Sequence, residues 1–543
     1  MLRPIVSSTL GSMNAVDVLV DKSGHLGPLS YSVPPELSVS VGDAVEVPFG
    51  RQIKYGVVVG PATNMSIQLK DIHASYGPRA DSREVQVAAI LAERHFTESR
   101  HMHARLAPNS AKGAPPLAAG PVQIRSIPQV TFSTAPESRA FVARAAALSP
   151  EHLALNLVAL AVQQDPTGQI LILCPSVPLV ESVLEGFVSG AARLDAAASR
   201  GAWRGFLDGT VQVGVGTRAA ALYSAKRLSC IIVLEADHPG HTAVKIPYVS
   251  SVEIASERSV AHDASLYLTG LVPKAQYIAT TKLTYATASG VAPCTTSLIS
   301  RFGTSPRRLV PPAAVLRIEQ ARRNGKRVVV VAPQDTVKRR CQSCRDVWET
   351  TSVSCVRCGS TSWKATGWDK ARLGEFFKDR VKVCSPAETA KLKDVDLLVL
   401  TGTDAALSRA SLQLEWEFAR YCASLTTCLS PAGELLLLSD DDGSTPVIKA
   451  VTSNNPRAVA RVVWAAAKTS ALPPFGTVVE IELNGRKSPP DVRNLPGRVL
   501  GPQRVDADSW RVVCIVQESD RKALQTALQK WRSLYKMRVT VAS

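Results

Sequence analysis

Short apolar runs separated by turn residues open the chain. From Val16 to Pro61 the runs VDVLV, AVEVPFG and YGVVVG alternate with segments rich in Gly, Pro and Asp, which predicts a small β-domain. The next stretch, REVQVAAILAERHF, has apolar residues at every third or fourth position and predicts a helix. The segment from Asn109 to Pro121 is rich in Pro, Gly and Ala, which is typical of a linker.

Beyond the linker the pattern predicts two consecutive α/β units. The first contains the apolar runs QILILC, VQVGVG, CIIVLEADH and SLYLTG, with helical stretches between runs. The second opens with RVVVVAPQ and is completed by DVDLLVL and GELLLLS. Strands that alternate with helices form parallel, doubly wound sheets. From ALPPFGTVVEIELNG onward the pattern is strand, loop, strand and helix, which predicts a small α+β domain.

A chain of 543 residues is too long for one hydrophobic core, so several domains are expected. We predict a multidomain α/β protein with a β-domain at 1–75, a helix and linker at 76–122, α/β lobes at 123–305 and 306–455, and a C-terminal α+β domain at 456–543. Two consecutive α/β lobes are the layout of helicases and other motor ATPases. The same layout occurs in other two-domain α/β enzymes, so the functional class has to be inferred from the residues that carry chemistry.

The charge of the chain favours a polyanionic partner. Lys and Arg outnumber Asp and Glu by 63 to 46, and the resulting net charge of +17 would attract nucleic acid. A charge that serves only solubility is the alternative. The longest apolar runs are strand-sized rather than membrane-spanning, and the first residues lack the pattern of a secretory signal, so we expect a cytoplasmic protein.

The stretch CQSCRDVWETTSVSCVRCGS contains two Cys-x-x-Cys pairs, Cys341 with Cys344 and Cys355 with Cys358. The seven other cysteines are scattered singly, and no His occurs after His262. Two such pairs complete a tetrahedral shell of four thiolates around one zinc ion. Such a shell has no open position for water, so the ion would be structural. The alternative is four buried thiols in a loop.

Basic residues lie beside two of the predicted features. Lys338, Arg339 and Arg340 precede the first cysteine pair and would place positive charge next to a ribbon at 338–366. Arg51 and Lys54 are predicted on the loop that follows a strand of the N-terminal β-domain. We therefore regard these five residues as candidate DNA contacts.

The parts of an ATP site are missing from the sequence. The segment from Val130 to Leu153, where a phosphate-binding loop belongs, has neither Gly nor Lys, so it lacks the glycines that let backbone amides wrap a triphosphate and the cation that neutralises it. The strand end that would hold magnesium reads Glu235-Ala236-Asp237-His238, without adjacent acidic residues. An aspartate-rich turn from Ser439 to Gly443 is typical of a solvated turn rather than a metal loop.

These stretches together resemble, in sequence order, the PriA family of primosomal helicases. The resemblance rests on YSVPPELSVSVGDAVEVPFG, LILCPS, VGVGTRAAA, LYLTGLVP, VRCGSTSWKATGW and LPPFG, and it spans most of the chain. It implies a 3′-end-binding β-domain at 1–75, two RecA-like lobes and a zinc ribbon inserted in the second lobe. It also implies that Tyr31, in the position of the family's 3′-end pocket, stacks on a base, although the family's Phe-Asp-Tyr reads Leu29-Ser30-Tyr31 here.

The departures from the family are as informative as the matches. The family's arginine-bearing motif in the second lobe is replaced by SLTTCLSPAG, so three parts of one ATP site are absent. The family usually has four cysteine pairs and two zinc ions. We interpret the two pairs here as the outer pairs, which share one ion.

The resemblance and the departures together predict a degenerate member of the family that does not hydrolyse ATP. We expect it to bind stalled, branched or single-stranded DNA and to assemble other primosome proteins and helicase-loading factors. Two alternatives stay open: an ATP-dependent 3′-to-5′ DNA helicase whose motifs align differently, and a zinc-ribbon module for protein interaction with no role on DNA.

Overall fold

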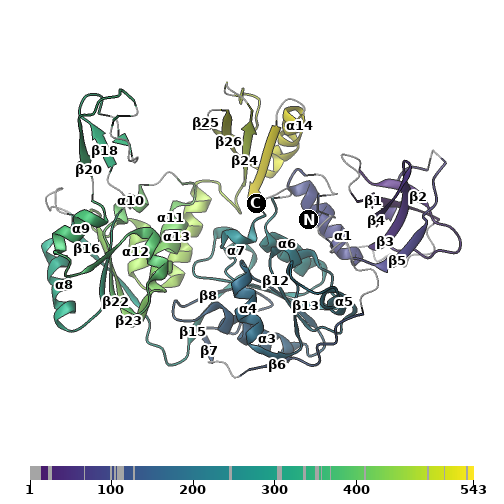
Figure 1. Cartoon of the computed structure of the whole chain (residues 1–543), viewed down its shortest axis with the longest axis horizontal. Coiled ribbons are helices and arrows are strands. Elements are labelled where there is room, and N and C mark those ends of the chain that lie inside the picture. The colour runs from purple at the N-terminus through teal and green to yellow at the C-terminus, as the bar shows by residue number, and fades with distance from the viewer. Residues whose placement is uncertain are drawn as a thin grey trace.

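The structure is a computed structural model. It describes residues 14–21, 27–65, 68–97, 101–102, 106, 115–125, 129–243, 248–301, 309–333, 338–345, 347–348, 354–355, 357–366, 368–408, 411–485, 488, 490–506, 508–532 and 536–542. Two α/β lobes lie side by side (Figure 1). In that view the N-terminal β-domain extends from the first lobe, and a cysteine-bearing ribbon and the C-terminal domain project from the upper edge of the lobes.

The N-terminal β-domain is one antiparallel sheet with the strand order β2-β1-β4-β3-β5. Its strands are β1 (Ala15–Val20), β2 (Leu29–Ser32), β3 (Asp43–Phe49), β4 (Gln52–Pro61) and β5 (Ala74–Pro78). Buried valines such as Val18, Val47 and Val58 fill its core. Because β5 ends at Pro78, the domain extends slightly beyond the predicted boundary at residue 75.

Helix α1 (Ser82–Arg94), which the periodicity of apolar residues predicts, follows this domain in the chain and packs on the first lobe. Asp81 caps its N-terminus by accepting a hydrogen bond from the Arg83 amide. Glu84, fully buried, accepts hydrogen bonds from Arg258 at 2.7 Å and from Nε2 of His262 at 2.8 Å. Burial raises the pKa of Glu84, but the charge of Arg258 and the hydrogen bond from His262 outweigh it and lower the pKa. These contacts fix α1 against α6 (Ser251–Ala261).

The first lobe has an eight-stranded sheet with the order β11-β12-β9-β13-β14-β8-β15-β7, parallel except for β7. Its strands are β7 (Val130–Phe132), β8 (Arg139–Arg144), β9 (Gln169–Leu173), β11 (Ala191–Arg193), β12 (Val213–Gly216), β13 (Leu228–Val233), β14 (Ser265–Gly270) and β15 (Lys282–Ala288), and β6 (Gln123–Ile124) pairs separately with β10 (Phe187–Ser189). The remaining helices are α3 (Pro150–Gln164), α4 (Val177–Glu185), α5 (Arg200–Asp208), α7 (Ala275–Thr280) and the 3-10 turns η1 (Arg218–Leu222) and η2 (Pro239–His241).

Both faces of this sheet are buried. Leu171 and Ile231 pack on the side of α1 and α6, whereas their neighbours Ile172 and Ile232 pack on the side of α3 and α4. Burial on two faces explains why the strands read as continuous apolar runs rather than alternating ones.

The second lobe has a five-stranded parallel sheet with the order β16-β23-β22-β17-β21. Its elements are β16 (Thr295–Ser300), α8 (Pro312–Arg323), β17 (Val328–Val331), α9 (Lys370–Phe377), β21 (Lys382–Cys384), η3 (Pro386–Lys391), β22 (Val395–Leu400), α10 (Thr403–Leu407), α11 (Leu414–Thr426), β23 (Leu429–Ser439), α12 (Pro446–Thr452) and α13 (Pro456–Thr469).

Two segments lie in the second lobe although the sequence assigns them elsewhere. Strand β16 falls before residue 305 but pairs along its length with β23, so the first sheet ends with β15. Helix α13 follows residue 455, yet its Val463 and Ala467 pack in the core of the second lobe. The sequence of an edge strand does not show which of two sheets the strand joins. The sequence of an amphipathic helix likewise does not show which lobe the helix packs against, and this explains both differences.

The C-terminal domain is an antiparallel four-stranded sheet with the order β25-β26-β24-β27, together with one helix. Its elements are β24 (Thr477–Asn484), β25 (Arg498–Asp506), β26 (Ser509–Val516), η4 (Glu518–Asp520), α14 (Arg521–Arg532) and β27 (Lys536–Ala542). This part of the chain therefore contains both strands and a helix, as the sequence predicts for a small α+β domain.

Phe96, two residues after the end of α1, reaches into the C-terminal domain. Phe96 is buried in the same core as Val479 and Leu524, which belong to β24 and α14. Arg521 lies over the Phe96 ring at 5.1 Å and donates a hydrogen bond to the carbonyl oxygen of Arg94, and Arg532 donates to the carbonyl of Phe96. Cations at the C-terminus of a helix interact favourably with its unpaired carbonyls. The C-terminal end of α1 is thus packed against the C-terminal domain.

Among the described residues, no helix is both long enough and apolar enough to cross a bilayer.

Candidate metal centre and nucleic-acid surfaces

The four paired cysteines lie together at one end of a small ribbon. Strands β18 (Lys338–Cys341), β19 (Val347–Trp348) and β20 (Trp363–Thr366) form its antiparallel sheet, with β18 in the centre. The first pair begins at Cys341, the last residue of β18, and the second pair precedes β20. The strand pairing therefore brings both Cys-x-x-Cys turns to the same end of the sheet.

The sulfur atoms fit a tetrahedral ion. All four Sγ atoms lie within 4.8 Å of one another. Sγ of Cys341 is 3.6 Å from that of Cys358, and Sγ of Cys344 is 3.5 Å from that of Cys355. Ligands at the usual zinc–sulfur distance of about 2.3 Å stand about 3.8 Å apart in a tetrahedron, close to these values. The cluster is thus able to hold a metal ion, and its thiolates suit zinc.

The two cysteine turns have the same backbone conformation. The amide of Arg345 donates to the carbonyl of Cys341 at 3.1 Å, and the amide of Gly359 donates to the carbonyl of Cys355 at 2.9 Å. Both donors follow the second cysteine of their pair, and both have positive φ, 62° for Arg345 and 72° for Gly359. Glycine adopts this conformation without strain, whereas Arg345 does not. The same hydrogen-bonded turn thus follows the first cysteine of both pairs.

The backbone also favours the thiolate form of the first cysteine. The amide of Cys344 donates to Sγ of Cys341 at 3.4 Å, and this hydrogen bond contributes most to lowering the pKa of Cys341, to about 6. Deprotonated sulfur is the form that binds metal. Cys341 and Cys355 are buried, while Cys358 is exposed, so the centre lies just under the surface of the ribbon.

At the carboxyl end of the first sheet, an ion pair occupies the place where open α/β sheets bind their ligands. Arg144, at the end of β8, donates from Nε to the Glu235 carboxylate at 2.6 Å and from Nη1 to the carbonyl oxygen of Leu148 at 2.9 Å. Both charged side chains are largely buried. The loop from β8 to α3 contains no glycine, and Ser149 caps the helix. The side chain of Arg144 thus closes this loop and neutralises Glu235.

The neighbouring acidic residue binds the second lobe. Asp237 is buried and accepts a hydrogen bond from Nε of Arg420 on α11. The indole of Trp416, one turn earlier on α11, donates to the carbonyl of Val272 in the first lobe at 3.2 Å. Two polar contacts and the packing of Val272 in the core of the second lobe therefore hold the lobes together.

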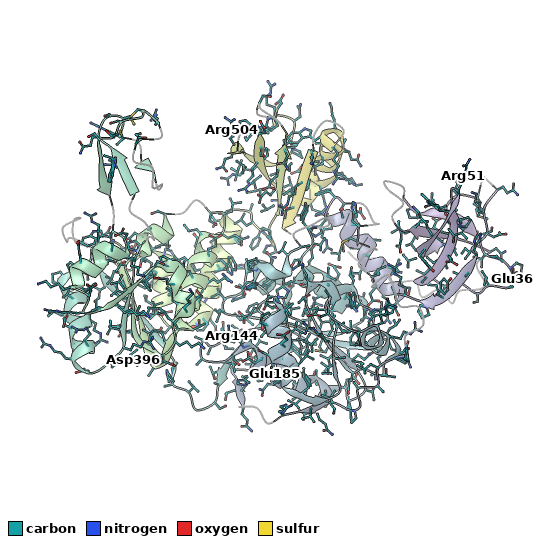
Figure 2. The ribbon with its side chains drawn as sticks, viewed as in Figure 1. Glu36, Arg51, Arg144, Glu185, Asp396 and Arg504 are labelled. Carbon is teal, nitrogen blue, oxygen red and sulfur yellow. The ribbon has the colours of Figure 1, made fainter. Side chains whose placement is uncertain are left out.

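The cavity beside Arg144, between the lobes, is small: it has a volume of about 180 Å³, and its lining includes Leu271, Cys422 and Val459. A larger cavity of about 740 Å³ is lined by Asp237, Trp416 and residues of the C-terminal domain. Pockets for small molecules usually occupy about 300 to 1,000 Å³. Figure 2 shows Arg144 on the side of the first lobe that faces the second lobe.

The structure places the candidate stacking residue of the N-terminal domain in its core. Tyr31 is only 4% exposed, packs with the valines of the sheet and donates from its hydroxyl to the carbonyl of Pro48 at 3.2 Å. A nucleobase cannot reach either face of a ring that is enclosed in this way. The ring of Tyr31 therefore fills the core in this conformation, and its predicted role in base stacking stays a prediction.

The two basic candidates of this domain lie near the surface. Arg51 is exposed at the tip of the β3–β4 hairpin, where Figure 2 labels it at the upper end of the domain. Lys54 is half-buried, and its ammonium lies 4.4 Å from the centre of the Phe49 ring. Sequence reasoning overlooked Tyr55 and Ile53 on the same hairpin, both of which are exposed. In the stretch QIKYG, apolar Ile53 and Tyr55 alternate with polar residues, and this pattern could have indicated that both side chains share one face of the strand.

The three basic residues before the first cysteine form most of β18. Arg340 is exposed and pairs across the sheet with Val347 and Lys364. Lys338 and Arg339 precede it on the same strand. The strand that carries these three basic residues is therefore the central strand of the ribbon, between β19 and β20.

The fold and the cluster define a class: a multidomain protein with two parallel α/β lobes and a four-cysteine ribbon inserted in the second. Residues 17–104 match the family model described as the PriA 3′ DNA-binding domain (3′BD). This match covers the N-terminal β-domain and α1 but far less than half of the chain. No curated protein matches the chain.

Solved structures also match, at low similarity. The protein Mss116p, bound to single-stranded RNA and AMP-PNP, is 9% identical over 59% of this chain and 69% of its own, with a TM-score of 0.29. The Hef helicase domain of Pyrococcus furiosus is 12% identical over 55% and 92%, with a TM-score of 0.28. The helicase MrfA bound to DNA is 13% identical over 71% and 54%, with a TM-score of 0.29.

Proposed function

We propose that this protein binds branched DNA at stalled replication forks and promotes primosome assembly there without unwinding DNA by ATP hydrolysis. The match of residues 17–104 to the PriA 3′ DNA-binding domain is the observation that carries the proposal. The net charge of +17 supports it, because phosphate neutralisation supplies much of the affinity for DNA.

The placement of the basic residues supports a shared DNA surface. The ribbon, the C-terminal domain and the end of the β-domain that carries Arg51 point toward the same edge in Figures 1 and 2. We assign phosphate contacts to Arg51 and Lys54 in the β-domain and to the three basic residues of β18, namely Lys338, Arg339 and Arg340. One zinc ion, held by the four cysteines, would keep the ribbon folded.

The absence of ATP turnover is proposed from the carboxyl end of the first sheet. We interpret the two lobes as RecA-like lobes in which Arg144 and Glu235 satisfy each other where magnesium and phosphate would be bound. A loop without glycine cannot wrap a triphosphate with its amides, and the cavity that Arg144 lines, about 180 Å³, is smaller than the usual pockets for small molecules.

Binding to a three-way fork and to a duplex of equal length tests the DNA role. We expect tighter binding to the fork and a steep fall in affinity with salt. Substitution Arg51→Ala should lower the salt slope by about one, while Arg323→Ala, at the end of α8 on the outer end of the second lobe, serves as a control of equal charge. Equal and weak binding to both DNAs would refute the proposal.

Nucleotide chemistry is tested separately. We expect neither binding of a fluorescent ATP analogue nor hydrolysis of ATP when single-stranded DNA is added. Clear DNA-stimulated turnover would instead establish the alternative, an ATP-dependent helicase.

The partners we propose are other primosome proteins and the factors that load the replicative helicase. Their recruitment to forks should require this protein, and a ribbon variant such as Cys355→Ser should reduce it if the ribbon is the docking element. Recruitment that is independent of DNA would favour the third possibility, a ribbon used only for protein contacts.

A further inference from the structure

One face of strand β4 carries an apolar stripe that its neighbours cover only in part. Ile53, Tyr55 and Val57 alternate along the strand and therefore share a face, opposite to the core valine Val58. Val57 is buried against the cluster that contains α1. Tyr55 is 44% exposed and Ile53 is 58% exposed. The stripe thus continues onto the surface beyond the part that α1 covers.

A second tyrosine fixes the orientation of the first. The rings of Tyr55 and Tyr76, from β4 and β5, have centroids 5.8 Å apart and planes at 47°. The Tyr76 hydroxyl donates to Oε2 of Glu46 at 2.9 Å, and Glu46 lies directly opposite Tyr55 on β3. This network holds the two rings before any ligand binds, which reduces the entropy lost on binding.

Positive charge lies at the strand end beside the exposed ring, because Arg51 is exposed at the hairpin tip. Lys54 pairs with the core residue Val47 and places its ammonium over Phe49, so its side chain lies on the opposite face of the strand. An aromatic ring with a cation at the adjacent hairpin tip is suited to a ligand that combines flat π-systems with phosphates. Glu46 is the acidic neighbour, and its carboxylate accepts the Tyr76 hydrogen bond.

We propose that Tyr55, supported by Tyr76, is the stacking platform of the N-terminal domain for an unpaired nucleobase of single-stranded DNA, with Arg51 on an adjoining phosphate. The proposal rests on the proposed DNA function of the chain and adds the site and the feature it recognises. It moves base stacking from Tyr31, whose ring fills the core, to the outer face of the same sheet.

An abasic oligonucleotide separates stacking from phosphate binding. Affinities of the full-length protein are measured for a short oligothymidylate and for an abasic strand with the same number of phosphates. Substitution Tyr55→Ala should weaken binding to oligothymidylate by about tenfold and leave binding to the abasic strand unchanged. Equal loss on both strands, or no loss on either, would overturn the proposal.

Two further variants guard against a merely structural effect. Tyr55→Trp keeps a stacking ring and should restore binding to oligothymidylate, so a variant that binds as weakly as Tyr55→Ala would also refute the platform. Arg51→Ala should weaken binding to both strands alike, because it removes only a phosphate contact. If the wild-type protein prefers forks but Tyr55→Ala changes nothing, the platform alone is wrong. If the wild-type protein binds neither strand nor forks, the proposed function is wrong as well.

Discussion

Nε of Arg144 lies 2.6 Å from Oε1 of Glu235, and this hydrogen-bonded ion pair joins the ends of β8 and β13 in the first lobe. Arg144 also holds the carbonyl of Leu148, so one side chain fixes the loop before α3. The guanidinium of Arg144 thus supplies the positive charge beside Glu235 at the carboxyl end of this sheet, where a bound cation could otherwise lie. Its loss should therefore affect stability before anything else.

Substitution Arg144→Ala should destabilise the first lobe. It leaves the buried Glu235 carboxylate unpaired, and breaking a buried pair in this way costs about 3 kcal/mol or more. The apparent midpoint of thermal unfolding should fall by several degrees. Arg493→Ala removes a pair that is almost fully solvated, between Arg493 and Asp491, and should change the midpoint little. Equal shifts in the two variants would contradict a structural role for the Arg144 pair.

The purified protein should contain one zinc ion per chain, because the four thiolates form a single closed shell. Substitution Cys355→Ser should abolish it, as measured by elemental analysis after gel filtration. Cys294→Ser is the matched control, since Cys294 lies outside the cluster and donates to the carbonyl of Ser430, which a hydroxyl can also do. Retained zinc in Cys355→Ser would show that the cluster is not the metal site.

Substitution Arg345→Gly should strengthen metal binding. The positive φ of Arg345 costs about 1 kcal/mol that glycine does not incur, so the zinc affinity should rise roughly fivefold. Gly359→Ala makes the reverse change at the equivalent position of the second turn and should weaken binding by a similar factor. Competition with a chromogenic chelator measures both, and changes of the same sign would contradict the equivalence of the two turns.

The first lobe should lose stability as the pH falls from 6.5 toward 4 because of His241. Burial lowers the pKa of this imidazole from 6.5 to about 4, and it bonds to Ser251 and to the carbonyl of Leu234 at 2.7 Å each. In this window the unfolded chain binds the proton and the folded one does not, so stability falls by ~2 kcal/mol at pH 5. His241→Gln, which does not titrate, should therefore show a smaller drop in thermal midpoint between pH 7 and pH 5. Parallel profiles for the two proteins would exclude this role.

The strands of both lobes could be predicted because they are buried on both faces. Runs such as QILIL and VVVV have no polar face to interrupt them, and they correspond to β9 and β17. Strand β16, TTSLIS, was not predicted because its mixed polar composition suits an edge position that only the neighbouring β23 reveals. The sequence also carries no signal for the lobe that an amphipathic helix such as α13 joins.

Candidate sites built from residues close together in the sequence could be predicted, whereas sites that join distant residues could not. The metal cluster depends on spacings of three residues, which the sequence shows directly. The pair of Arg144 and Glu235 joins positions 91 residues apart, and no local pattern indicates it. Tyr31 and Tyr55 each stand in a strand with an alternating pattern, but a shift of one residue in the pattern exchanges the two faces. Only the folded sheet shows that Tyr31 faces inward and Tyr55 outward.

The contact of Phe96 with the last domain has a consequence for synthesis on the ribosome. Residues of β24, β26 and α14 form the core around Phe96, so a newly made chain cannot complete that core from its C-terminal residues alone. The end of α1 has to wait, with its carbonyls uncapped, until Arg521 and Arg532 have been translated. The residues at the end of α1, although made early, are therefore among the last parts of the molecule to reach their final contacts.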